Sequence, residues 1–126
     1  MVSIRIEQKR DDAVERPAGV VTLADRKRFR IDEIRAGIRA LRQELARYGR
    51  AHGGTFWLFG SAANGRVHYD SDIDILVDFG EAQTAAALAF AEGACIRLRL
   101  RPDISPKSWC TPAFIDRIKP TALVLP

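Results

Sequence analysis

Cysteine and histidine are scarce in this chain of 126 residues, which contains two of each. The positions of Cys95, Cys110, His52 and His68 match no common zinc-binding spacing, so we assign no zinc site. Two cysteines are too few for a disulfide framework, and in a reducing compartment free thiols are favoured over a bridge. Apolar runs long enough to cross a bilayer are also lacking, and no signal-peptide pattern opens the chain. These absences lead us to expect a cytoplasmic protein.

The length and composition of the chain indicate one globular domain with a core of its own. Hydrophobic residues make up 47% of the chain and charged residues 29%. The charge is unevenly distributed, with 13 Lys/Arg against 8 Asp/Glu in residues 1–50, 1 against 6 in residues 51–92 and 6 against 2 in residues 93–126. An acidic middle suits a metal site. Basic flanks suit a polyanion such as a nucleotide, a nucleic acid or an acidic partner protein, although arginine-rich helices can equally be solvated surfaces.

A long amphipathic helix is predicted after residues 1–21, which we expect to form a mobile N-terminal arm. Thr22 with Asp25 three residues later is typical of a helix start, and Gly53 follows the last periodic residue. The apolar stripe of this helix consists of Ile31, Ile34, Ile38, Leu41, Leu45 and Tyr48. We expect the stripe to pack on a sheet, and a helix-pairing interface is the alternative.

The remaining chain predicts a small α/β domain, spanning residues 22–126, in which one sheet carries helices. Apolar runs and strict alternation predict strands, and alanine-rich or proline-initiated segments predict helices. The predicted strands are residues 55–59, 73–79 and 96–101, and the predicted helices after the first are residues 61–64, 81–92, ended by Gly93, and 112–118.

The most informative motif is Gly60-Ser61, then ten residues, then Asp72-Ile73-Asp74. Side chains alternate between the two faces of a strand, so Asp72 and Asp74 should project to the same side. Two carboxylates at that separation can bind divalent cations such as Mg²⁺, usually with help from substrate phosphates. The Gly-Ser turn supplies backbone N–H groups and a hydroxyl for a phosphate. The combination indicates phosphoryl or nucleotidyl transfer.

Asp103 is a candidate third carboxylate. If the strand at 96–101 keeps its register through Pro102, Asp103 shares a face with three arginines and lies at the end of a strand beside the Asp72/Asp74 strand. A two-metal site needs more than two carboxylates. The arginines, Arg97, Arg99 and Arg101, could meet a triphosphate, although we expect at least two of them to face solvent.

Together these residues resemble the nucleotidyltransferase domain of the DNA polymerase β superfamily. The short length and the chain order are similar to those of its minimal nucleotidyltransferases, many of which act as antitoxins paired with a HEPN-domain toxin. The resemblance covers residues 31–125 and implies a mixed sheet flanked by helices.

The resemblance also implies roles for individual residues. Gly60 and Ser61 would hold the β,γ-phosphates of a nucleoside triphosphate, and Asp72 and Asp74 would bind two Mg²⁺ ions. Asp103 would bind one ion and help to deprotonate or orient the acceptor hydroxyl. In the antitoxin members that acceptor is a tyrosine of the toxin, and the transferred group is AMP from ATP.

One departure from the family pattern concerns the residues after Gly-Ser. Family members often carry an arginine there, whereas this chain reads Ala62-Ala63-Asn64-Gly65. Arg66 or an arginine near Asp103 could substitute. The sequence therefore also allows a catalytically vestigial module that neutralises a partner toxin, and a transferase acting on RNA or a small molecule.

Overall fold

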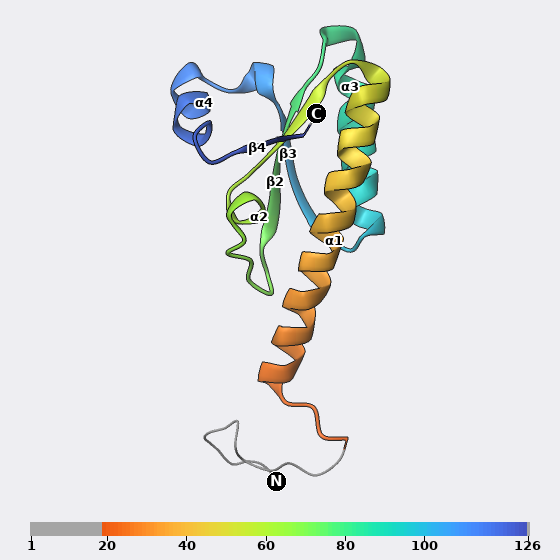
Figure 1. Ribbon diagram of the computed structural model, residues 1–126, viewed down its shortest axis with the longest axis vertical. Coiled ribbons are helices and arrows are strands. Elements are labelled where there is room, and N and C mark those ends of the chain that lie inside the picture. The colour runs from red at the N-terminus through yellow and green to blue at the C-terminus, as the bar shows by residue number, and fades with distance from the viewer. Residues whose placement is uncertain (1–18, 126) are drawn as a thin grey trace.

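The computed structural model describes residues 19–125, so most of the predicted N-terminal arm lies outside the described part of the chain. A long first helix is followed by strands that alternate with shorter helices (Figure 1). The elements are α1 (Leu23–His52), β1 (Thr55–Phe59), α2 (Ser61–Asn64), β2 (Asp72–Asp78), α3 (Glu81–Arg97), β3 (Arg101–Pro106), a 3₁₀ turn (Lys107–Trp109), α4 (Pro112–Ile118) and β4 (Leu123–Leu125).

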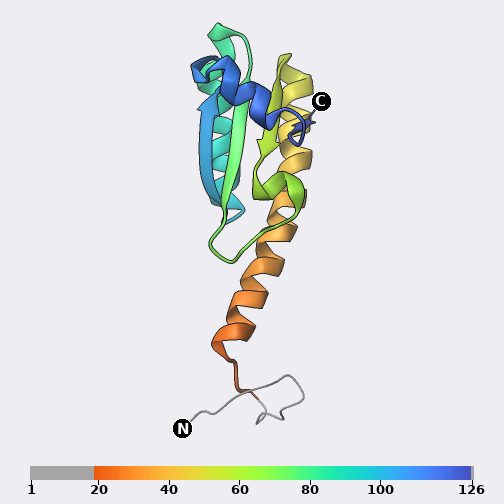
Figure 2. The same cartoon turned by 90° about the vertical axis from the view of Figure 1, so that its left-hand side faces the viewer.

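Helix α1 begins and ends where the sequence predicts. Its first turn is a capping box, in which the Asp25 N–H donates to Thr22 Oγ1 (3.0 Å) and the Thr22 N–H donates to Asp25 Oδ2 (3.1 Å). It ends at Gly53, which adopts φ 76° and donates its N–H to the Gly49 carbonyl. The first turns of α1 project beyond the sheet, as Figures 1 and 2 show.

The four strands form one mixed sheet in the order β3-β2-β1-β4. Strand β1 is antiparallel to both β2 and β4, whereas β2 and β3 are parallel. Strand β3 lies at the edge of the sheet and can therefore accommodate Pro102. Proline has no backbone N–H, and an edge strand hydrogen-bonds to a neighbouring strand on one side only. The sequence did not predict β4, which has three residues and is too short to show a pattern.

Helices α1 and α3 cover one face of the sheet, and α4 lies on the other side (Figures 1 and 2). Most of the predicted α1 stripe is buried in that helix–sheet layer, which confirms that the stripe packs on the sheet; Ile31 and Tyr48 are only partly buried. Each fully buried aliphatic side chain contributes roughly 1.5–3 kcal/mol. The main core residues are Ile34, Ile38, Leu41, Leu45, Phe56, Leu58, Ile73, Ile75, Val77, Ala87, Ala91, Ala94, Cys95, Leu100 and Leu125.

The third predicted strand, residues 96–101, is wrong. Helix α3 does not end at Gly93 but continues to Arg97, and β3 begins only at Arg101. The buried positions Ala91, Ala94 and Cys95 have helical spacing, so packing on the core prolongs the helix through the alternating Arg-Leu segment. Burial of the helix against the core therefore outweighs the alternation of polar and apolar residues, which by itself favours a strand.

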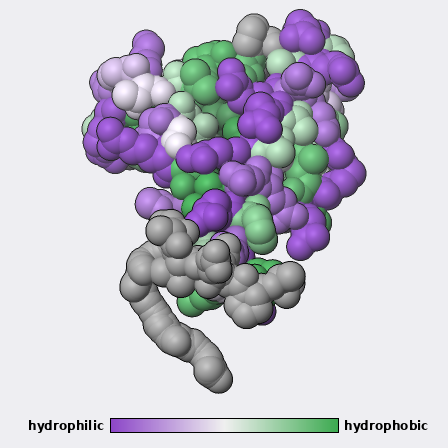
Figure 3. All heavy atoms as spheres, turned by 60° about the horizontal axis from the view of Figure 1, so that its bottom comes forward, coloured by the Kyte–Doolittle hydropathy of each residue, from purple (hydrophilic) through white to green (hydrophobic). Residues whose placement is uncertain are grey.

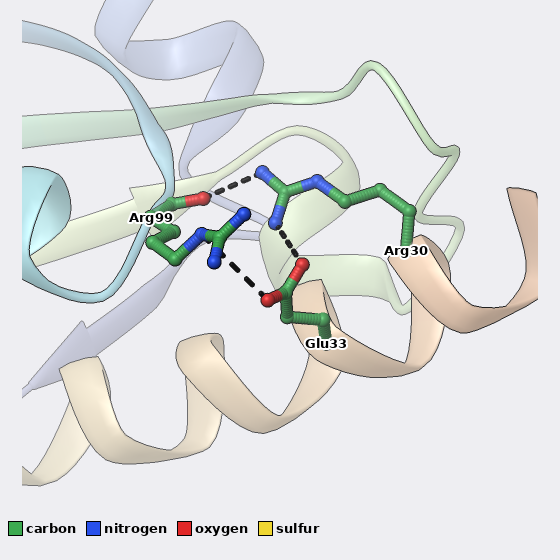
Figure 4. Close-up of polar contacts among 3 residues, drawn as sticks. All are labelled: Arg30, Glu33 and Arg99. Carbon is green, nitrogen blue, oxygen red and sulfur yellow. Dashed lines mark hydrogen bonds and ion pairs between the residues drawn. The ribbon is translucent and has the colours of Figure 1, made fainter. Parts of the chain in front are cut away.

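The turn between α3 and β3 depends on Arg99, which adopts φ 61°, a left-handed conformation that costs a non-glycine residue energy. Helix α1 holds this turn, as Figure 4 shows. Arg30 donates to the Arg99 carbonyl and to Glu33 Oε1 (2.6 Å), and Arg99 Nε lies 3.7 Å from Glu33 Oε2. These contacts lower the pKa of Glu33, chiefly through the hydrogen bond from Arg30.

Two further expectations can be compared with the structure. Cys95 and Cys110 are both free, as the sequence suggested, and burial raises the pKa of the Cys95 thiol to about 11. Within residues 19–125 no helix is both long and apolar enough to span a membrane.

Candidate functional site

The three aspartates of interest lie on two neighbouring strands. Ile73 and Ile75 are fully buried against the helices, so Asp72 and Asp74 project from the opposite face of β2, as predicted. Asp103 is the third residue of β3 rather than a residue at its end. Because β2 and β3 are parallel and in register, Asp74 is directly paired with Asp103.

Asp74 and Asp103 interact directly. Their register pairing places the two carboxyl groups next to each other, and the pKa of Asp74 is raised to about 6. Partial burial is the largest cause, followed by the negative charge of Asp103, the hydrogen bond with Asp103 and the charge of Asp72. A carboxyl pair of this kind is poorly neutralised by the protein itself, which favours a proton or an added cation.

Gly60 directly follows β1 and lies next to the Asp74 carboxylate. It follows Phe59, the register partner of Asp74, and adopts φ 67° and ψ −147°. A Cβ atom at this position would lie 2.4 Å from Asp74 Oδ2. Glycine is therefore required both for the backbone conformation and for the approach of the Asp74 carboxylate. Ser61 opens helix α2 immediately beside it and is half-buried.

Asp72 has a different partner. Arg101, its register partner on β3, places Nε 3.2 Å from Asp72 Oδ1. The Arg101 guanidinium also donates to the Asp70 carbonyl at 3.2 Å. The Asp72 carboxylate is thus engaged with an arginine, while Asp74 has another carboxylate, Asp103, as its register partner. As these side chains are placed, no group of three His, Cys, Asp or Glu residues among residues 19–125 encloses a metal position.

The donor set nevertheless suits a hard divalent cation. Carboxylate oxygens from β2 and β3 are the ligands that Mg²⁺ prefers, and it is usually bound by one or two carboxylates together with substrate phosphates. Because Gly60 has no side chain, that position does not crowd the Asp74 carboxylate. The residues present therefore fit a Mg²⁺-dependent phosphate site.

All three arginines are largely exposed, as expected for at least two of them, but two do not lie on the strand face that the sequence assigned to them. Arg97 lies in helix α3 and pairs with Glu44 of α1, and Arg99 pairs with Glu33. Neither belongs to a strand face with Asp103. Arg101 does, because it lies two residues before Asp103 in β3. The sequence could not single it out because the strand was placed too early.

Comparison with known families agrees with this geometry. The family described as "Nucleotidyltransferase domain" matches residues 38–120, which is well over half of the chain. The chain belongs to this family.

A solved structure, described as that of a candidate minimal nucleotidyltransferase, also resembles this domain. It is 28% identical in sequence, with a TM-score of 0.60 over 71% of this chain and 93% of the other. No curated protein matches the chain. Both similarities support nucleotidyl transfer as the general activity of this nucleotidyltransferase domain and confirm the mixed α/β fold.

The family match begins at Ile38, in the middle of α1. The first 15 residues of that helix, residues 23–37, lie before the region that the family defines. The first turns of this segment project from the body of the domain (Figure 2), whereas Ile34 is buried in the core. This part of α1 therefore lies outside the region of this nucleotidyltransferase that the family match covers.

Proposed function

We propose that this domain is a Mg²⁺-dependent nucleotidyltransferase that moves AMP from ATP to a hydroxyl group of a partner protein, as the antitoxin of a toxin–antitoxin pair. The observation that carries the proposal is the direct pairing of Asp74 with Asp103 across parallel strands, with Asp72 on the same face and Gly60 against Asp74. The family supports nucleotidyl transfer, and the acceptor and the antitoxin role rest on the resemblance to minimal nucleotidyltransferases.

In this proposal Asp72, Asp74 and Asp103 hold two Mg²⁺ ions. Bound Mg²⁺ neutralises the developing charge on the attacking and leaving oxygens of an in-line displacement. Gly60 and Ser61 position the β,γ-phosphates through backbone N–H groups and the Ser61 hydroxyl. Because α2 has four residues, these local donors rather than a helix dipole provide the contact.

The protein's own contribution is to orient the substrate and accept a proton. Asp103 accepts the proton of the acceptor hydroxyl, whose oxygen forms the new bond to the α-phosphorus. The bond from the α-phosphorus to the bridging oxygen of the β-phosphate breaks, and pyrophosphate leaves. Positioning and charge neutralisation supply most of the acceleration in such a reaction.

The decisive test follows label from the α-phosphate of ATP in the presence of Mg²⁺. We expect the label to become attached to protein, so that protease releases it. Transfer should fall by at least about 100-fold in Asp74→Asn and Asp103→Asn. Asp78→Asn is the matched control, since Asp78 lies on the same strand and face but pairs with Lys107 (3.6 Å). Label sensitive to ribonuclease instead would redirect the proposal to an RNA acceptor, and equal activity in all variants would refute the site.

A partner-binding role without catalysis is the second candidate, and the projecting end of α1 favours it. In its first turns Leu23 and Phe29 are 66% and 59% exposed, and Val20 and Val21, just before the helix, are exposed as well. Over the visible surface of the domain, hydrophilic side chains are interspersed with hydrophobic ones (Figure 3). Apolar side chains beside arginines suit a protein surface of opposite charge.

The two candidates give different results with the same variants. A binding module would retain its partner in Asp74→Asn and lose it in a Leu23→Ser/Phe29→Ser double variant. A transferase would lose label transfer in Asp74→Asn and retain it in the Leu23→Ser/Phe29→Ser double variant. Complex formation can be measured by calorimetry, and circular dichroism verifies that each variant is folded.

A further inference from the structure

Arg101 contacts the acidic motif from the neighbouring strand. It is the register partner of Asp72, its Nε lies 3.2 Å from Asp72 Oδ1, and its guanidinium also donates to the Asp70 carbonyl at 3.2 Å. The guanidinium is therefore anchored at two points, one of them a backbone atom of the loop before β2. This places a cation directly beside one of the three proposed metal ligands.

The surroundings distinguish Arg101 from the arginines that precede it. Arg97 and Arg99 form ion pairs with α1 residues, Glu44 and Glu33, on the helical side of the domain. Arg101 instead shares the strand face of Asp103. Its side chain is 63% exposed, so the guanidinium can also reach a ligand in solvent.

We propose that Arg101 is a positioning residue that exchanges partners when substrate binds. This inference rests on the proposed function. In the free domain Arg101 neutralises Asp72 and competes with a divalent cation for that carboxylate. When the Mg²⁺–nucleoside triphosphate complex binds, Asp72 turns to the cation, and the released guanidinium binds phosphate oxygens. Arg101 thereby supplies the positive charge that family members often place after the Gly-Ser motif.

The exchange is energetically easy in both directions. An ion pair between exposed side chains contributes little to stability, so Asp72 can leave Arg101 at small cost. A guanidinium binds phosphate with two parallel hydrogen bonds, a geometry that a lysine ammonium does not reproduce. The two halves of the proposal therefore predict effects of opposite sign on metal binding and on nucleotide binding.

The experiment titrates the wild type, Arg101→Gln and Arg101→Lys with two probes. The first probe is Mn²⁺ alone, followed by electron paramagnetic resonance of the free ion. The second is the Mg²⁺ complex of α,β-methylene-ATP, followed by calorimetry. Arg99→Gln is the matched control, since it removes the same charge two residues earlier, and Arg66→Gln tests the other candidate cation near the Gly-Ser turn.

We expect Arg101→Gln to bind Mn²⁺ alone more tightly, by up to about fivefold, because the competing ion pair is gone. The same variant should bind the Mg²⁺–nucleotide complex about tenfold more weakly, because a charge-assisted hydrogen bond is lost. Arg101→Lys should restore part of the nucleotide affinity, and Arg99→Gln should resemble the wild type with both probes.

Several results would overturn the inference. Weaker binding of both probes by Arg101→Gln would assign it a merely structural role, and unchanged binding of both would exclude the exchange. A loss of nucleotide affinity in Arg66→Gln with none in Arg101→Gln would assign the phosphate contact to Arg66. A folded wild type that binds neither probe would refute the proposed function itself, together with the exchange.

Discussion

Replacing Asp74 with asparagine should stabilise the metal-free domain at alkaline pH. The pKa of Asp74 is raised from 3.8 to about 6 by burial and by the neighbouring carboxylates of Asp103 and Asp72. A shift of that size would correspond to roughly 3 kcal/mol for a buried group. Because Asp74 is only partly buried, solvent screening reduces this to about 1 kcal/mol. Asparagine keeps the size and polarity of the side chain beside Asp103 without adding a second negative charge.

The sign of the pH dependence follows from linkage. Between pH 4 and pH 6 folded Asp74 binds more protons than unfolded Asp74, so its contribution to stability is fully present below pH 4 and is lost as the pH rises through about 6. The advantage of Asp74→Asn should therefore be about 1 kcal/mol at pH 8, or a few degrees in Tm, and close to zero at pH 4.

Thermal unfolding followed by circular dichroism at both pH values, with EDTA present, measures this difference. Asp32→Asn is the control, because Asp32 is an exposed carboxylate of α1 away from the site. Added Mg²⁺ should then raise the Tm of the wild type and not that of Asp74→Asn. A variant that is less stable than the wild type at pH 8, or a difference that does not change with pH, would refute the reasoning.

Three further substitutions test residues whose backbone φ is positive. Gly60→Ala should destabilise the fold by about 1–3 kcal/mol in urea unfolding and weaken Mg²⁺–nucleotide binding, since its Cβ would lie 2.4 Å from Asp74 Oδ2. Gly65→Ala, at φ 79° with no atom within 4 Å of the new Cβ, should show only the backbone cost of about 1 kcal/mol; equal effects would disprove the close contact. Arg99→Gly should gain up to about 1 kcal/mol from the left-handed position while losing only an exposed ion pair to Glu33, so a clear loss of stability in the same assay would show that the pair matters more than the strain.

Much of the fold was predictable because its signals are local. The capping box at Thr22 and Asp25, the helix stop at Gly53 and the boundaries of β1 depend on residues within a few positions of one another. The common face of Asp72 and Asp74 follows from the alternation of side chains in any strand. The family resemblance pointed to the same residues from their spacing alone.

The end of α3 and the start of β3 could not be predicted in the same way. The alternation of Ile96 to Arg101 is typical of a strand, but Ala91, Ala94 and Cys95 are buried against the core and keep the chain helical to Arg97. Strand β4 was missed for a related reason, since three residues become a strand only by pairing with β1.

The amino-acid sequence by itself determined the presence of two carboxylates on one strand face, the glycine turn before them and the long capped helix, because each depends on short-range geometry. Only the tertiary structure decided that Asp103 pairs with Asp74, that Arg101 is the arginine beside Asp72 and that Gly60 must lack a side chain. The first two relations depend on the register of β2 and β3, which helix α3 separates in the chain, and the third depends on the register of β1 and β2. A register is set by packing over the whole core rather than by neighbouring residues.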